Sequence, residues 1–241
     1  MGLVYSYMII KKLVVSFYGL ALILIFSCAK DKYPLQMTDQ TKAIHSYLAL
    51  GDSYTIGESV PSTDNFPNQT AQFLKASGYD LKPAEIVAKT GWTTDELQNS
   101  INNHSFSPPY DIVTLLIGVN NQYRGRPVDS YKPEFENLLK QAIQFAGNKA
   151  DHVIVLSIPD WGVTPFASGR DREQIAREID AYNVANKMIS EQYKVHYIDI
   201  TPWTREATTD VSLLAPDGLH PSAKEYKRWA EKISAIIKQF L

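Results

Sequence analysis

Cysteine is almost absent from this 241-residue sequence, in which Cys28 is the only one. A single cysteine excludes an intrachain disulfide and any metal site built from several cysteines. Basic residues are not in excess, with 24 Lys and Arg against 26 Asp and Glu and a formal net charge of −2, so no nucleic acid partner is expected. The histidines are scattered without ligand spacing. We therefore expect no metal and no other cofactor.

Long hydrophobic runs are also missing. The apolar run at residues 13–26 is shorter than the roughly 20 residues that a membrane-spanning helix needs. It follows Lys11 and Lys12 and precedes Ser27 and Cys28, an order typical of a secretion signal. Residues 25–28 resemble a bacterial lipobox, in which the cysteine is lipidated and becomes the new N-terminus.

These features predict a signal peptide at residues 1–27, a lipidated Cys28, a polar tether at 28–41 and a folded domain at 42–241. The expected location is the bacterial cell envelope, with the protein lipid-anchored and either periplasmic or surface-exposed. A plainly cleaved signal and a signal-anchor helix are the alternatives, and either Met1 or Met8 is the true start. The choice between inner and outer membrane stays open.

From residue 42 onward, strand-like apolar runs alternate with helical patterns. Nearly continuous Val, Ile and Leu are typical of strands that are covered on both faces. Apolar residues at three- and four-residue steps indicate amphipathic helices. Such alternation predicts one domain with a parallel sheet and helices on both faces. The expected strands are residues 46–50, 85–88, 112–117, 153–158 and 195–200, and the expected helices are 66–77, 94–101, 135–146, 173–193 and 222–241.

Small and polar residues follow each of the five expected strands. In an open parallel sheet, ligands bind beyond the carboxyl ends of the strands. The pattern therefore places these segments together on one rim of the sheet. They are residues 51–55, 90–92, 118–121, 159–161 and 201–203.

The first of these segments, 51–55, and a further segment at 217–221 together supply the groups that a serine esterase needs. A serine hydroxyl is a weak nucleophile that requires an adjacent, oriented base. His220 is the best candidate base, and Asp217 lies three residues before it. On a tight turn that spacing brings the carboxylate to one imidazole nitrogen and leaves the other nitrogen for Ser53. The alternatives are that Ser53 is a helix N-cap and that Asp217 belongs to a plain turn.

Four short blocks, in this order along the chain, resemble those of the SGNH (or GDSL) hydrolase family. The segment 51–55 resembles the first block, with Ser53 at the nucleophile position. Gly91 and Asn120 match the second and third blocks, and Asp217 and His220 match the last. The resemblance covers nearly all of residues 42–241.

The resemblance implies a flavodoxin-like three-layer α/β/α sandwich with a five-stranded parallel sheet. It also implies an oxyanion hole formed by the backbone N–H groups of Ser53 and Gly91 and the side-chain amide of Asn120. One position departs from the family pattern, because Asn121 stands where the third block usually has an aspartate. That change puts the local hydrogen bonding of the loop in question.

Aromatic residues lie near the same rim, and they either stack on sugar rings, enclose an acyl chain or pack the loops. We predict a serine esterase acting on acetylated carbohydrates, lysophospholipids or small acyl esters. The alternatives are a non-catalytic glycan-binding lipoprotein and an acyltransferase that uses the same triad. The expected partners are a small-molecule or glycan ester and, through the lipid anchor, the membrane; the oligomeric state is left open. The rim aromatics are Tyr54, Trp92, Tyr123, Trp161 and Trp203.

Overall fold

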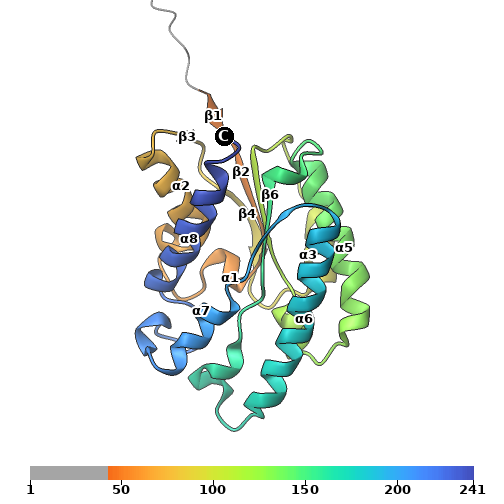
Figure 1. Cartoon of the computed structure of the whole chain (residues 1–241), viewed down its shortest axis with the longest axis vertical. Helices are drawn as coiled ribbons and strands as arrows, with labels where there is room; N and C mark the ends of the chain where they lie inside the picture. Colours follow the sequence, from red (N-terminus) through yellow and green to blue (C-terminus); the bar gives the residue numbers. More distant parts are fainter. Residues whose placement is uncertain (1–42) are drawn as a thin grey trace, which may run out of the picture. The chain divides into compact units, whose positions relative to one another are not determined.

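The computed structural model describes residues 43–241 (Figure 1). The expected signal peptide, the lipidated Cys28 and the tether at 28–41 lie outside these residues and stay predictions. Within residues 43–241, no helix has the length and apolar character to cross a membrane.

A five-stranded parallel sheet forms the centre of the domain. Its spatial order is β4-β2-β5-β6-β7, and every neighbouring pair is parallel. Numbered by their order along the chain, these strands follow the order 2-1-3-4-5, which is the doubly wound order of flavodoxin-like folds. The predicted fold class is confirmed. The strands are β2 (Tyr47–Asp52), β4 (Glu85–Lys89), β5 (Ile112–Leu116), β6 (Val153–Leu156) and β7 (His196–Ile198).

Helices cover both faces of the sheet and complete three layers, with α2 and α8 on one face and α3, α5 and α6 on the other (Figure 1). These five are α2 (Phe66–Ala76), α3 (Thr94–Asn102), α5 (Val128–Phe145), α6 (Arg172–Gln192) and α8 (Ala223–Ile237). Three short helices directly follow strands or their end loops: α1 (Ser53–Ile56), α4 (Val119–Tyr123) and α7 (Thr201–Arg205).

Several smaller elements have no counterpart in the sequence patterns. Two-residue strands β1 (Ile44–His45) and β3 (Asp80–Leu81) pair in parallel as a separate sheet. Short 3₁₀ helices occupy the loops: η1 (Ser62–Asp64), η2 (Ala150–His152), η3 (Trp161–Val163), η4 (Pro165–Ala167), η5 (Glu206–Thr208) and η6 (Val211–Leu213).

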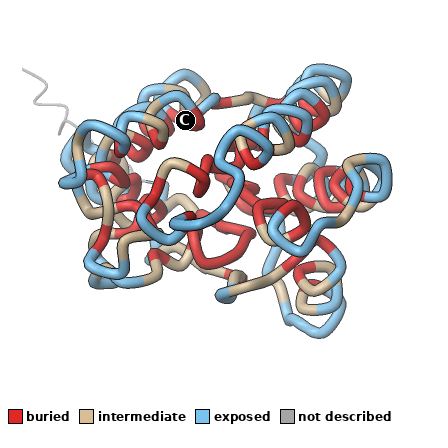
Figure 2. The backbone as a smooth tube through the Cα atoms, turned by 90° about the horizontal axis from the view of Figure 1, so that it is seen from below, coloured by how far each residue is buried: buried red, intermediate tan, exposed pale blue. Residues whose placement is uncertain are grey.

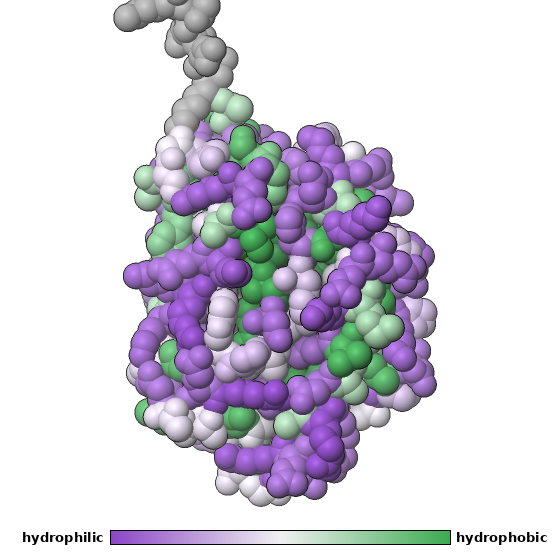
Figure 3. All heavy atoms as spheres, in the orientation of Figure 1, coloured by the Kyte–Doolittle hydropathy of each residue, from purple (hydrophilic) through white to green (hydrophobic). Residues whose placement is uncertain are grey.

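The core lies between the sheet and its two helical layers. Strands β2, β5 and β6 are buried along their whole length, as expected for apolar strands covered on both faces. Seen from below the view of Figure 1, the buried segments gather in the middle and exposed turns surround them (Figure 2). The space-filling view shows mostly polar side chains on the flanking helices and a narrow apolar band between the layers (Figure 3). Burial of this apolar surface is the main force that holds the layers together.

Candidate active site

Ser53 is the first residue of α1 and directly follows the last residue of β2. The chain turns sharply here, and Gly51 allows it. A Cβ atom on Gly51 would lie 2.1 Å from Thr55 Oγ1 and 2.4 Å from the Leu116 carbonyl oxygen. Asp52 then caps the helix, because its Oδ1 accepts a hydrogen bond from the Tyr54 N–H at 3.0 Å. The strand and the turn together deliver Ser53 to the carboxyl edge of the sheet.

Asp217 and His220 share one tight loop just before α8. The Ala215 N–H donates to the His220 carbonyl oxygen at 2.7 Å, and Leu214 bridges to Pro221, which closes the loop at its base. Asp217 Oδ1 accepts the backbone N–H groups of Leu219 and His220, each at 3.0 Å. The loop therefore fixes its own carboxylate beside its own imidazole.

The structure brings Ser53, His220 and Asp217 into one chain of contacts. His220 Nδ1 lies 2.6 Å from Asp217 Oδ2, and His220 Nε2 lies 2.9 Å from Ser53 Oγ. With the Nδ1 proton donated to the carboxylate, Nε2 is left to accept the serine proton. His220 is only 6% exposed. The arrangement can deprotonate a serine hydroxyl and later return the proton to a leaving group.

Asp217 is anionic at neutral pH. Partial burial raises the pKa of its carboxyl group, but hydrogen bonds from His220, the Leu219 N–H and Ser59 outweigh burial and lower the pKa to about 2. A fixed negative charge beside Nδ1 stabilises the imidazolium that forms when Ser53 loses its proton.

Gly91 and Asn120 contribute two further segments to the site. Gly91 has φ +84°, a left-handed conformation that suits glycine. The Asn120 amide nitrogen lies 3.0 Å from the Trp92 carbonyl oxygen and 3.4 Å from Asp52 Oδ2. Ser53, Gly91 and Asn120 line the same cavity as His220. Three segments of the chain thus border the cavity at the nucleophile.

Asp52 accepts a hydrogen bond from Asn120 and is 1% exposed. Burial raises the pKa of its carboxyl group to about 7, although hydrogen bonds from the Tyr54 N–H and Asn120 act in the opposite direction. Its side chain accepts hydrogen bonds from the Tyr54 N–H at the start of α1 and from Asn120, not from His220. A supporting role fits these contacts better than a role in proton transfer.

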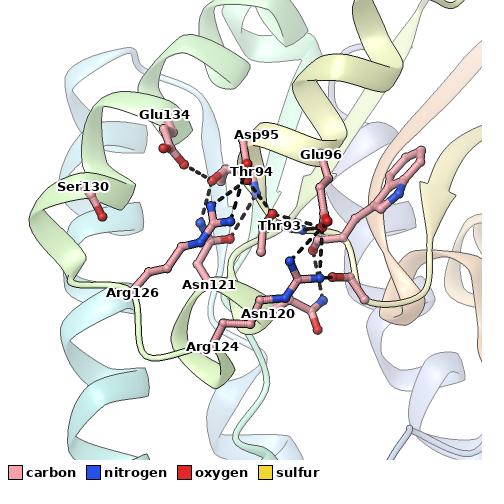
Figure 4. A network of polar contacts seen from close by, with 12 residues as sticks. Thr93, Thr94, Asp95, Glu96, Asn120, Asn121, Arg124, Arg126, Ser130 and Glu134 are labelled. Carbon is pink, nitrogen blue, oxygen red and sulfur yellow. Dashed lines mark hydrogen bonds and ion pairs between the residues drawn. The ribbon is translucent and has the colours of Figure 1, made fainter.

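Asn121, which stands where the family usually has an aspartate, makes two hydrogen bonds within its loop region. Its Oδ1 accepts the Thr94 N–H at 3.0 Å, and its Nδ2 donates to Thr94 Oγ1 at 2.6 Å (Figure 4). Thr94 Oγ1 itself donates to Glu134, so it needs a donor as its other partner. An amide offers that donor, whereas an ionised carboxylate does not. Asparagine therefore fits this buried position.

Two arginines tie the Gly91 loop and α4 to the first turn of α3 (Figure 4). Arg124 Nη2 donates to the Gly91 carbonyl oxygen at 2.7 Å, and the same guanidinium pairs with Glu96 at 3.1 Å. Arg126 pairs with Asp95 at 2.6 Å. Only Arg124 reaches the backbone of the loop that borders Ser53.

A cavity of about 140 Å³ opens beside Ser53 and His220. Three of the predicted rim aromatics, Tyr54, Tyr123 and Trp161, line it. Phe166 is 49% exposed, and its ring centre lies 6.1 Å from that of Tyr123. Among the other lining residues, Thr90 and Val119 belong to the predicted rim segments 90–92 and 118–121, whereas Phe166 and Leu219 lie outside the predicted rim segments.

The other two predicted rim aromatics do not line this cavity. Trp92 packs partly buried against the core and borders a separate depression beside α3. Trp203 lies in α7, where the Arg228 guanidinium sits 5.4 Å from its ring centre. Both follow strand ends, as predicted, but their side chains make their contacts elsewhere, Trp92 with the core and Trp203 with the core and Arg228.

No cluster of three or more His, Cys, Asp or Glu side chains suited to a metal ion occurs among residues 43–241.

Solved structures with the same fold include several ester hydrolases. TesA aligns with a TM-score of 0.64 at 17% identity, over 82% of this chain and 100% of its own. The acetylxylan esterase Axe2 from Geobacillus stearothermophilus gives 0.63 at 18% identity, over 80% and 94%. The psychrotrophic esterase EstA from Pseudoalteromonas sp. gives 0.60 at 16% identity, over 81% and 97%. Likeness at this identity establishes the fold.

The sequence itself establishes the family. No curated protein matches the chain closely enough to be a relative. The family model of the GDSL-like lipases and acylhydrolases, however, matches residues 49–228, which is most of the described domain. The chain belongs to the GDSL-like lipase/acylhydrolase family and is an ester-hydrolysing serine hydrolase.

Proposed function

We propose that the protein hydrolyses short-chain carboxylic esters through an acyl-enzyme on Ser53. His220 takes the hydroxyl proton as Ser53 Oγ attacks the ester carbonyl, and it returns that proton to the departing alcohol. Water, deprotonated by His220, then attacks the acyl-enzyme, and the acid is released as Ser53 recovers its proton.

In the same proposal, the negative charge on the carbonyl oxygen is stabilised by the Ser53 and Gly91 N–H groups and the Asn120 amide. A glycine lets the backbone come close to the substrate, and an asparagine amide donates without adding charge. Loss of one such donor typically lowers turnover by about 10²–10³.

The observation that supports the reaction best is the pair of contacts on His220. One nitrogen lies 2.9 Å from Ser53 Oγ and the other 2.6 Å from Asp217 Oδ2. Both nitrogens are thus engaged in the order that base catalysis requires. The open cavity begins at this serine.

The size of the cavity supports a short acyl group. Its volume of about 140 Å³ is close to the roughly 150 Å³ of an apolar cavity that accommodates benzene. An acyl group of about two to six carbons fills a space of this size, whereas a long fatty chain extends beyond it. Tyr123 and Phe166 are 43% and 49% exposed, which makes them suitable to contact the alcohol part of the ester.

The test is a chain-length series on purified residues 29–241, with p-nitrophenyl acetate, butyrate, octanoate and palmitate, beside an acetylated oligosaccharide. The wild type should hydrolyse the two shortest esters fastest. Ser53→Ala should lower kcat by about 10⁴-fold or more, because no other group replaces the nucleophile. Ser130→Ala, an exposed serine on α5, is the matched control and should leave the rate unchanged.

Equal rates for the wild type and Ser53→Ala would sink the proposal. Fastest turnover of palmitate would contradict the short-chain assignment but leave the serine mechanism in place. An ester product that forms only when a second alcohol is added, with little free acid, would mark an acyltransferase instead.

A further inference from the structure

The loop that follows α1 is fastened to the helix that carries Ser53. The N–H groups of Gly57 and Glu58 both donate to the Ser53 carbonyl oxygen, at 3.1 and 3.0 Å. Val60 packs against the core, and the Glu58 carboxylate accepts the hydroxyl of Thr90. The backbone between Gly57 and Val60 is therefore fixed relative to the nucleophile.

Ser59, within this loop, has a backbone conformation that serine seldom adopts. Its φ is +65°, and only Asn148 and Lys194 share a positive φ among the non-glycine residues that the structure describes. A left-handed conformation costs a residue with a Cβ atom free energy, and it persists only where the surroundings enforce it. Asn148 and Lys194 precede β6 and β7, at the amino edge of the sheet, away from the site.

The side chain of Ser59 reaches the carboxylate of the catalytic loop. Ser59 Oγ donates to Asp217 Oδ2 at 2.7 Å. The same oxygen accepts from His220 Nδ1 at 2.6 Å. Oδ1 takes its two hydrogen bonds from the N–H groups of Leu219 and His220. Ser59 is thus the donor to this carboxylate that comes from outside the Asp217–His220 loop.

We propose that Ser59 is a positioning residue, which orients Asp217 Oδ2 toward His220 and couples the loop of the base to the helix of the nucleophile. The inference rests on the proposed function. It explains why a serine occupies a position whose backbone favours glycine: glycine would relieve the backbone but offer no hydroxyl. Ser59 does not line the substrate cavity, so its effect should fall on kcat and not on KM.

Loss of the Ser59 hydroxyl should also shift the pH dependence of the reaction in one direction. A hydrogen bond to an anion withdraws part of its charge, so removing it leaves more negative charge facing His220 and favours the imidazolium. The acid limb of the kcat/KM profile should therefore move to higher pH. The other titratable groups that interact around the pair are Asp52, Glu58, Asp160, Tyr54 and Tyr226, and the Ser59 variants retain all five.

The experiment compares Ser59→Ala and Ser59→Gly with the wild type on p-nitrophenyl acetate. Both variants should lose about three- to tenfold in kcat with KM unchanged, because both lack a charge-assisted hydrogen bond. Both should move the acid limb upward by a few tenths of a pH unit. Their stabilities should differ, since only glycine adopts φ +65° freely, so Ser59→Gly should melt at a higher temperature than Ser59→Ala.

Lys194→Gly is the matched control. It relieves a left-handed residue at φ +58° far from Ser53, and it should change neither kcat nor the pH profile. Recovery of wild-type kcat in Ser59→Gly, or equal kcat in all variants, overturns the inference and leaves the esterase proposal intact. Activity that survives Ser53→Ala instead overturns the proposed function and the role of Ser59 with it.

Discussion

The two flanks of Ser53 hold their carboxylates in opposite ways. On the histidine flank (Ser59, Asp217 and His220), Asp217 accepts four hydrogen bonds and its side chain is 29% exposed. On the amide flank (Asp52, Gly91, Asn120 and Arg124), Asp52 is 1% exposed. Hydrogen bonding lowers the pKa of Asp217 to about 2 even though burial acts against it, whereas burial raises the pKa of Asp52 to about 7.

The difference shows which carboxylate suits which task. An acid that stays ionised can stabilise a neighbouring imidazolium through the catalytic cycle. A buried acid that is partly protonated near neutral pH is a poor counter-ion, but it can cap a helix and support an amide. Proximity to the serine in sequence is therefore a weak guide, because Asp52 adjoins Ser53 while Asp217 is remote in the chain.

Exchanging each carboxylate for its amide tests this comparison most strongly. Asp217→Asn removes the charge beside His220 and favours the wrong tautomer, so kcat should fall by about 10³–10⁴. Asp52→Asn keeps an oxygen for the Tyr54 N–H and should cost no more than about tenfold. The kcat values of both variants on p-nitrophenyl acetate provide the measurement.

Circular dichroism of both variants serves as the control for folding. Comparable losses of kcat in two folded variants would remove the distinction between the flanks. A larger loss in Asp52→Asn would reverse it and make Asp52 the partner of the base.

The sequence predicted the elements that have strong periodicity. Runs of apolar residues predicted strands β2, β5 and β6, and amphipathic spacing predicted helices α6 and α8. The apolar pattern predicted a helix only from residue 135 to 146, whereas α5 begins at Val128. Val128 and Tyr131 continue the apolar spacing into its first turns, but Pro133 and the polar residues around it weaken the helical signal there. The two-residue strands β1 and β3 are too short for any pattern.

The site was predictable where chemistry restricts the residue type. Ser53, Asp217 and His220 stand out because few side chains serve as nucleophile, base and orienting acid. Phe166 lines the cavity from a segment without periodicity, so nothing in the sequence marks it, and Leu219 lies between Asp217 and His220, where no pattern tells that its side chain lines the cavity. The contact of Ser59 with Asp217 spans 158 residues, and the only local sign of it, a positive φ, is a property of the folded backbone.

The free energy of unfolding should depend on pH in a way that reports the raised pKa of Asp52, the buried carboxylate of the amide flank. The folded-state pKa of Asp52, about 7, lies above its ordinary value of 3.8. Between these values the folded protein keeps a proton that the unfolded chain releases, so the free energy of unfolding falls as pH rises from about 4 to 7. Each pH unit contributes up to about 1.4 kcal/mol. The lowered pKa of Asp217 acts in the opposite direction, because it adds to the free energy of unfolding above about pH 4 and this contribution is lost only below that pH.

Denaturant unfolding of the wild type and Asp52→Asn at pH 5 and pH 7 isolates the effect. Other groups titrate alike in both proteins, so the wild type should lose about 2 kcal/mol more than the variant over this interval. An identical pH dependence in the two proteins would show that Asp52 ionises normally, and the contrast with Asp217 would vanish.

The smallest effect concerns how the amide flank is held in place. Arg124 and Arg126 both pair with acids in the first turn of α3, but only Arg124 also binds the Gly91 carbonyl oxygen, at 2.7 Å. If that contact sets the direction of the Gly91 loop, Arg124→Met should lower kcat by about tenfold through a misplaced oxyanion donor. Arg126→Met removes the same charge from the same surface and should change kcat by less than about twofold. Equal losses in the two variants would assign the effect to surface charge, and the amide flank would then depend on Asn120 and the backbone alone.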